Sequence, residues 1–320
     1  MRRFIFQLLF FLIPILIFAV IGDFFISKEL MKSHRPPDEY SVWNDIYDGK
    51  IDSKIAIYGS SRAWVQIDPQ IISDSLHMPA YNFGIDGHNF WLQYLRHTIF
   101  LNNNNKRPQL IIYSLDVFTL QKRDDLYNSD QFLPYMFFNN QIRTATLDYK
   151  GFNVFDFFLP LVRYYGRKRA LFQALNVFLN HQKDSIIRIK GYQGQNASWN
   201  SDLSNAKKGM ESYEIKLDTP TIKLFKTYLQ ECKSKNIKII FVYSPEYIDG
   251  QKFVKNRGAV IDLYENLSKK YDIPFYDYST DSMSYQKKYF YNAEHLNKSG
   301  SEIFTNKLVK ELKLMKVGSM

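Results

Sequence analysis

The sequence contains one cysteine, Cys232, so no disulfide can form within the chain. The folded protein must therefore rely on core packing, which a chain of 320 residues permits. We expect the Cys232 thiol to be a small buried hydrophobe on a helix. The 6 histidines lack the spacing of metal ligands, and no phosphate-cradling glycine loop is present. We therefore expect no metal and no organic cofactor.

Acidic residues are also scarce relative to basic ones. The chain has 32 Asp and Glu against 42 Lys and Arg, a formal net charge of +10. The basic residues are dispersed, and no recognisable nucleic-acid motif accompanies them, so we expect no nucleic-acid partner. An anionic membrane surface or a polyanionic glycan accounts more simply for the charge.

The one long apolar run lies at the N-terminus. Phe4–Gly22 carries no charge, and at about 1.5 Å per residue it comes close to spanning a ~30 Å hydrocarbon core. Arg2 and Arg3 precede it, which favours a cytoplasmic N-terminus and an extracytoplasmic body on a bacterial-type cell membrane. A cleaved signal peptide is the alternative, but no A-x-A-like site follows the run cleanly. We predict an uncleaved, single-pass signal-anchor over residues 1–27.

A polar stalk over residues 28–50 and an α/β domain over 51–316 are predicted to follow. The domain contains apolar runs without polar alternation, which are typical of strands buried on both faces of a parallel sheet. Amphipathic helical patterns alternate with them, so we expect a doubly wound α/β fold. The predicted strands are Lys54–Tyr58, Ala80–Phe83, Gln109–Leu115, Lys238–Ser244 and Ile273–Ser279.

Residues 121–217 interrupt this alternation and are too long for an ordinary crossover. The segment is rich in aromatic residues and contains the basic run Arg163–Arg169 ahead of an apolar helix. We interpret it chiefly as a helical cap over the rim of the sheet. The alternative is a surface for a membrane or a membrane partner.

Potentially reactive side chains follow the first and last predicted strands. Gly59-Ser60-Ser61-Arg62 ends the first, and His295 lies in a polar loop after the last. Serine as the N-cap of an ordinary strand-to-helix turn would explain the first motif by itself. However, the carboxyl ends of parallel strands share one rim, where a hydroxyl nucleophile and an imidazole base could meet for acyl transfer.

The order of these motifs along the chain resembles that of the sequence motifs in SGNH (GDSL-like) esterases and acyltransferases. More narrowly, they resemble the membrane-anchored Gly-Ser-Ser-Arg branch that includes relatives of D-alanyl-transfer and alginate O-acetylation proteins. The resemblance covers roughly Lys54–Leu314, with the middle insertion unmatched. It implies a flavodoxin-like three-layer sandwich in which Ser61 is the nucleophile and His295 the base. The backbone N–H groups of Ser61 and Gly87 would form the oxyanion hole.

Two positions depart from the pattern of this family. Where an aspartate usually precedes the histidine by three residues, this chain has Asn292, which can orient an imidazole but cannot neutralise an imidazolium. Glu294 or Asp277 could supply the missing carboxylate. Asp116 occupies the place of an oxyanion-donating asparagine, so its carboxylate would have to point away, be protonated or bind substrate.

Two further charged residues are candidates for substrate contact. Glu246 follows the fourth predicted strand on the same rim, where a solvated loop carboxylate is the simpler alternative. Arg62 adjoins the proposed nucleophile and could pair either with an anionic acceptor or with a carboxylate at the edge of the core.

The resemblance implies transfer of an acyl group, acetyl foremost, through a serine acyl-enzyme to hydroxyls of a cell-surface or exported glycan. It also implies a membrane-bound O-acyltransferase as partner or acyl donor. Two alternatives remain open: a carbohydrate esterase (deacetylase) with the same serine and histidine, and a non-catalytic SGNH-like protein that binds glycan or scaffolds a membrane acyltransferase complex.

Overall fold

The computed structural model describes residues 2–34, 40–49, 51–87, 89–104, 106–180, 188–315 and 317. The chain divides into two compact units. The anchor unit comprises residues 1–44 and 124–187, and the sheet unit comprises residues 45–123 and 188–320. The predicted anchor and stalk limits at residues 27 and 50 stay predictions, and residues 35–39 and 50 of the stalk lie outside the described residues.

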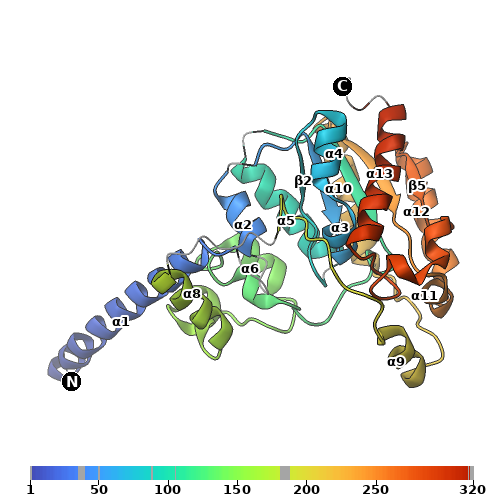
Figure 1. Ribbon diagram of the computed structural model, residues 1–320. Helices are drawn as coiled ribbons and strands as arrows, with labels where there is room; N and C mark the ends of the chain where they lie inside the picture. Colours follow the sequence, from blue (N-terminus) through green and yellow to red (C-terminus); the bar gives the residue numbers. More distant parts are fainter. Residues whose placement is uncertain are drawn as a thin grey trace. The chain divides into compact units, whose positions relative to one another are not determined.

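The sheet unit contains five parallel strands in the order β2-β1-β3-β4-β5 (Figure 1). This is the flavodoxin-like order, with the chain reversing direction across the sheet after β2. The predicted parallel α/β fold is therefore confirmed, and each strand lies within two residues of its predicted limits. The strands are β1 (Ile55–Gly59), β2 (Ala80–Asn82), β3 (Leu110–Leu115), β4 (Lys238–Tyr243) and β5 (Phe275–Asp277).

Aliphatic side chains cover one face of the sheet. Alternate residues of the central strands, among them Ile57, Ile112 and Val242, pack in one cluster with Phe304 and Leu308. The helices on this face are α3 (Ser61–Gln66), α4 (Pro69–Leu76) and α13 (Lys298–Leu314). Ser61 begins α3, and the loop that carries His295 leads into α13. Because both helices pack on this face, the two residues lie at the same edge of the sheet.

Aromatic side chains cover the other face. Tyr113 of β3 contacts the rings of Phe90, Phe225 and Tyr228, with centroids 5.2 to 6.2 Å apart. Cys232 is fully buried beside them, as expected for a small hydrophobe, and burial raises its pKa to about 12. The principal helices here are α5 (Phe90–Asn103), α10 (Thr219–Ser234) and α12 (Arg257–Tyr271). Burial on both faces explains why the strands read as continuous apolar runs.

Shorter elements complete the rim of the sheet unit. They are α9 (Asp202–Gly209), α11 (Ile248–Phe253), η3 (Ser282–Tyr285) and η4 (Lys287–Tyr289). The predicted insertion is thus divided: residues 188–217, including α9, belong to the sheet unit, and residues 124–187 belong to the anchor unit.

The anchor unit begins with α1 (Arg2–Leu30), which is long and apolar enough to cross a membrane, with a mean hydropathy of 2.9 in its most apolar window. Its remaining elements are short helices and turns joined by irregular segments. They are α2 (Tyr40–Tyr47), which leads into the sheet unit, η1 (Ser129–Phe132), α6 (Asn140–Thr146), α7 (Phe155–Phe158), η2 (Val162–Tyr164) and α8 (Lys168–Asn180).

Candidate active site

The turn between β1 and α3 gives two adjacent serines different partners. Ser60 is the N-cap of α3, since its Oγ accepts the backbone N–H of Arg62 at 3.3 Å. The same hydroxyl donates to a carboxylate oxygen of Asp116 at the end of β3. The ordinary N-cap interpretation thus applies to Ser60, while Ser61 is the first residue of the helix and has its hydroxyl available for another contact.

Gly59 permits this turn. It adopts φ +147°, and a Cβ there would lie 2.6 Å from the carbonyl oxygen of Ser114 on the neighbouring strand. Residues with a side chain rarely adopt that backbone conformation, and no Cβ tolerates such an approach. The close passage of β1 against β3 therefore fixes the position from which Ser61 projects.

Ser61 contacts His295 across the rim. Its Oγ donates to His295 Nε2 at 2.7 Å, and His295 Nδ1 lies 3.0 Å from Asn292 Oδ1. Because an amide oxygen only accepts, the network assigns the proton to Nδ1 and leaves Nε2 as the acceptor. Burial, helped by the charge of Arg62, lowers the pKa of His295 to about 3. The imidazole is thus neutral near pH 7, which is the form that can accept a proton.

The loop that carries the histidine is held by Asn292. Its Oδ1 also accepts the backbone N–H groups of Glu294 at 3.0 Å and His295 at 2.9 Å, so one amide oxygen closes the turn and orients the ring. Tyr291 stacks on the imidazole with ring centroids 5.3 Å apart. Gln66 of α3 donates to the carbonyl oxygen of Glu294 at 2.8 Å, which ties this loop to the helix of the serine.

A carboxylate that the sequence analysis missed lies behind Asn292. The amide nitrogen of Asn292 donates to Asp202 Oδ2 at 3.4 Å, and Asn200 donates to the same oxygen at 2.8 Å. Asp202 is the first residue of α9, and its charge acts to raise the pKa of His295, against the effect of burial. No motif marks this residue in the sequence, because its partner is 90 positions away.

A cavity of about 300 Å³ opens over these residues. Ser61 and Gly87 line it together, as the resemblance implies for two oxyanion donors, and His295 forms part of its wall. Asn89 lines it as well. This side chain is only 5% exposed, and its amide makes no hydrogen bond with any part of the chain that the structure describes. Asn89 is thus a second candidate that the sequence analysis did not identify.

Asp116 lines the same cavity but is already engaged. One carboxylate oxygen accepts from Ser60, and the other accepts the backbone N–H of Phe118 at 2.8 Å. With 2% of its surface exposed, it fastens the serine turn to the end of β3. The carboxylate is thus held by its own neighbours, an arrangement that the three possibilities considered from the sequence did not include.

Arg62 and Glu246 are brought together. Arg62 Nη1 and Glu246 Oε1 are 2.6 Å apart, and both side chains are almost fully buried. Arg62 also donates to Ser244, and the hydroxyl of Tyr243 donates to Glu246 Oε2 at 2.9 Å. Arg257 Nε also lies 3.5 Å from Glu246 Oε2. Loss of Glu246 would leave the buried Arg62 without its carboxylate, which is costly. Because Arg62 belongs to α3, the pair fixes the helix of the serine to the segment that follows β4.

The two carboxylates predicted to replace the family aspartate lie apart from His295 Nδ1, which contacts Asn292. Asp277, at the end of β5, accepts the backbone N–H of Ser279 at 2.8 Å and does not line the cavity. Glu294 does line it. Glu294 is solvent-exposed, yet partial desolvation by the surrounding protein, with repulsion from Glu246 and Asp116, raises its pKa to about 7.

A second cavity, of about 260 Å³, adjoins the first and shares Phe118, Tyr213 and Glu294 with it. The rings of Phe118 and Tyr213 are in contact, with centroids 5.7 Å apart. Beyond them, α9, α11 and the residues that follow these helices add an apolar lining of Leu203, Ala206, Met210, Phe253 and Val254. The carboxylates of Asp202, Glu246 and Glu294 line the same chamber, so it offers both apolar and acidic surface.

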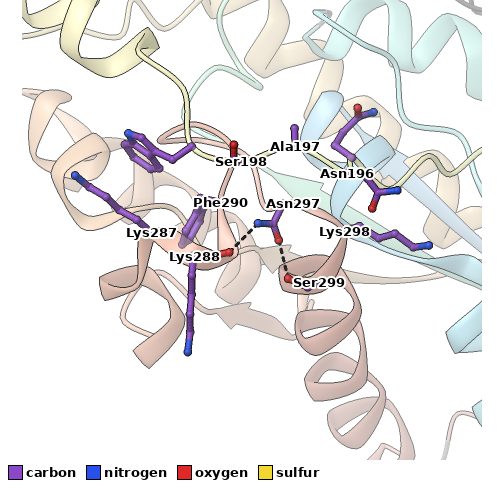
Figure 2. Close-up of a pocket in the computed structure, with 11 residues that line it drawn as sticks. Asn196, Ala197, Ser198, Lys287, Lys288, Phe290, Asn297, Lys298 and Ser299 are labelled. Carbon is purple, nitrogen blue, oxygen red and sulfur yellow. Dashed lines mark hydrogen bonds between the residues drawn. The ribbon is translucent and has the colours of Figure 1, made fainter.

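An open groove of about 560 Å³ is lined by Asn297 and neighbouring residues of the sheet unit (Figure 2). Asn297 forms its floor, donating to the carbonyl oxygen of Lys288 at 2.8 Å and accepting from the hydroxyl of Ser299 at 2.9 Å. Trp199 lines the groove, and the ammonium of Lys287 lies 5.1 Å from its ring centroid. The groove thus combines an aromatic surface with positive charge, and Asn297 in its lining is two residues from His295 in the sequence.

Comparisons with known proteins give little further guidance. No family model matches the chain, and no curated protein matches it. Among solved structures, a Bacteroides fragilis protein described as a candidate acylhydrolase is similar, with a TM-score of 0.37 and 14% sequence identity. The match covers 83% of this chain and 89% of that one. At this distance, the chemistry of the present chain must be argued from its own side chains.

Proposed function

We propose that this protein is a membrane-anchored serine O-acyltransferase that transfers a short acyl group, acetyl foremost, to hydroxyls of a cell-surface or exported glycan. The observation that carries this proposal is the 2.7 Å contact between Ser61 Oγ and His295 Nε2 at the edge of a cavity. A hydroxyl hydrogen-bonded to a neutral, oriented imidazole is the arrangement that activates serine as a nucleophile.

In the first half-reaction, Ser61 Oγ bonds to the acyl carbon while His295 Nε2 takes the hydroxyl proton. The resulting oxyanion would be held by the backbone N–H groups of Ser61 and Gly87, with the amide of Asn89 as a third donor. Collapse of this intermediate breaks the bond to the leaving group, which receives the proton from His295. The acyl group then remains on Ser61.

In the second half-reaction, the glycan hydroxyl gives its proton to Nε2 and attacks the acyl-serine. Departure of Ser61 returns the proton to its Oγ, so the enzyme is regenerated. Both halves pass through an imidazolium, which the low pKa of His295 disfavours. The negative charge of Asp202, relayed through the amide of Asn292, offsets part of that cost.

The surroundings of the site support both substrates. The chamber next to Phe118 and Tyr213 would receive the acyl group, with its apolar side against the hydrocarbon part. The groove with Trp199 and Lys287 offers a ring on which a sugar can stack and a charge for anionic substituents. These features favour a glycan acceptor over a small soluble alcohol.

Membrane attachment rests on α1, which has the length and hydropathy of a membrane-spanning helix. Its last two turns make buried contacts with the rest of the anchor unit, including the ion pair of Asp23 with Arg163. Cleavage beyond Asp23 would remove this partner of the arginine, which supports an anchor that stays attached. By resemblance to the membrane-anchored SGNH branch, we propose a membrane-bound O-acyltransferase as the acyl donor.

The first test is labelling of the full chain in detergent with a fluorophosphonate, which reacts only with an activated serine. We expect labelling of the wild type, loss of labelling in Ser61→Ala, and retention of labelling in Ser204→Ala, a control serine on α9. A folded wild type that takes no label would contradict the catalytic proposal and favour the binding or scaffold alternative.

A second measurement separates transfer from hydrolysis. The acyl-enzyme formed from an activated acetyl ester is incubated with and without a hydroxyl-bearing oligosaccharide. Transfer predicts a stable acyl-Ser61 that is discharged only when the acceptor is added. Rapid release of acetate without an acceptor would instead identify a carbohydrate esterase with the same residues.

A further inference from the structure

Large apolar side chains face outward at many positions of the anchor unit beyond α1. Tyr165 is 90% exposed and Phe172 is 63% exposed, values far above those of the core. Others with at least 45% of their surface exposed are Tyr127, Phe138, Val154, Phe155, Leu159, Leu175, Phe178 and Leu179. Monomeric soluble proteins rarely expose so many large apolar groups in one small unit, and such surfaces mark an interaction site.

Helix α8 concentrates this feature. Ala170 and Ala174 form its buried side, so the helix packs on the unit through small residues. Its exposed apolar side chains, here called the outer face of α8, are Leu171, Phe172, Leu175, Phe178 and Leu179. Lys168 and Arg169 precede them at the N-terminal end. An apolar face with basic residues beside it is typical of a helix that lies in a membrane interface.

The helix is fixed to the end of α1. Figure 1 shows α8 beside α1, and the rings of Phe25 and Phe178 are 5.0 Å apart. Asp23 of α1 forms a buried ion pair of 2.6 Å with Arg163, and Ser27 Oγ lies 2.7 Å from the hydroxyl of Tyr164. Because α1 is the candidate membrane span, the outer face of α8 lies where that span leaves the hydrocarbon.

We propose that the outer face of α8 is inserted into the interfacial region of the bilayer that α1 crosses. The ligand is the lipid surface itself, with acyl chains against Phe172 and Leu179 and anionic headgroups near Lys168 and Arg169. We choose lipid over protein as the occupant because the outer face of α8 adjoins the spanning helix. The bilayer is therefore present there whether or not a protein partner binds. The proposal does not depend on the chemistry of Ser61.

The test is nitroxide accessibility in the full chain, reconstituted at one copy per nanodisc of phosphatidylcholine and phosphatidylglycerol. Labels are placed at Phe172→Cys and Leu179→Cys, with Lys269→Cys on α12 as the solvent-exposed control; Cys232 is buried and stays unlabelled. We expect the two α8 labels to collide preferentially with oxygen, which partitions into lipid. The control label should collide preferentially with a water-soluble nickel complex.

Two outcomes would overturn the proposal. Nickel accessibility at Phe172→Cys equal to that of the control would place the outer face in water. A label shielded from both oxygen and nickel would mean that protein covers this face. Unchanged fluorophosphonate labelling of Ser61 or an unchanged unfolding temperature verifies that each variant is folded. Because two positions are labelled separately, failure of one variant to fold leaves the other as the test.

Discussion

Asp202 and His295 are joined through a single amide. Asn292 accepts from Nδ1 of the imidazole through its oxygen and donates to Asp202 Oδ2 through its nitrogen at 3.4 Å. A carboxylate thus stands one side chain further from the histidine than in a serine–histidine–aspartate triad. The order Ser61, His295, Asn292, Asp202 accounts for a neutral residue at the position where the resemblance leads one to expect a charge.

Replacing Asp202 by Asn should slow acylation of Ser61. Removing the charge lowers the pKa of His295 further and weakens the support for its imidazolium. A hydrogen bond to a charged group contributes about 1.5–3 kcal/mol, but Asp202 is solvent-exposed and acts through an amide, so at most roughly 1 kcal/mol should remain, or about fivefold in rate. The measurement is the rate of fluorophosphonate labelling, with Lys207→Ala on the same helix as control.

The reciprocal exchange tests the same relay. Asn292→Asp alone sets two carboxylates side by side, so we expect little gain in rate. Asn292→Asp combined with Asp202→Asn moves the charge directly onto Nδ1, should raise the pKa of His295, and should label faster than the wild type. If both single variants and the double variant react at the wild-type rate, Asp202 has no part in positioning the base.

Asn89→Ala should remove an oxyanion donor. Loss of one such donor costs roughly 3–4 kcal/mol of transition-state stabilisation where it has been measured, or 10²–10³ in kcat. We expect kcat for an acetyl ester to fall by about that factor with little change in KM. Gln121→Ala, which removes another amide from the same cavity, is the matched control and should affect kcat far less.

Glu294 should make the folded state less stable as the pH rises. Its folded pKa is raised from 4.5 to about 7, so the native state holds the proton more tightly than the unfolded chain does. Stability from this group is fully present below pH 4.5 and is lost between pH 4.5 and 7. Thermal unfolding of Glu294→Gln should show a smaller decline across this interval, whereas an identical pH dependence in both proteins would contradict the assignment.

The strands and the serine–histidine pair could be predicted because simple geometric rules govern them. Residues such as Ile57 and Ile112 are buried in a sheet covered on both faces, which gives an unbroken apolar pattern. Ser61 and His295 follow strands of one parallel sheet and therefore lie at one edge. Neither inference needs information about which distant segments pack together.

The remaining features depend on such packing. Arg62 and Glu246 were each predicted as possible substrate contacts, but a sequence gives no sign that they form a buried pair with each other. Asp202 follows no strand, and its role depends on where α9 lies. Likewise, α1 extends beyond its apolar run to Leu30, and Asp23 in this extension pairs with Arg163, a contact that the hydropathy pattern does not reveal.

Gly250→Ala should impair catalysis through the histidine loop. Gly250 lies in α11 without an unusual φ angle, but a Cβ there would approach Cβ of Ala293 to 2.7 Å. The loop carrying Asn292 and His295 would have to move, and overpacking of this kind costs roughly 1–3 kcal/mol. We expect slower labelling of Ser61 in a folded protein. The double variant Gly250→Ala/Ala293→Gly removes the clash and should recover the rate; without recovery, the glycine matters for another reason.

The chamber next to Phe118 and Tyr213 should set the longest acyl group that the enzyme accepts. Ala206 lines it from α9, and Ala206→Phe would fill much of its 260 Å³. Because each buried CH₂ contributes about 0.8 kcal/mol, loss of the chamber should lower kcat/KM for a butyryl ester by roughly tenfold while sparing the acetyl ester. The ratio of the two rates cancels any general loss of active protein. An unchanged ratio would mean that the acyl group extends elsewhere, toward the open groove beside Trp199.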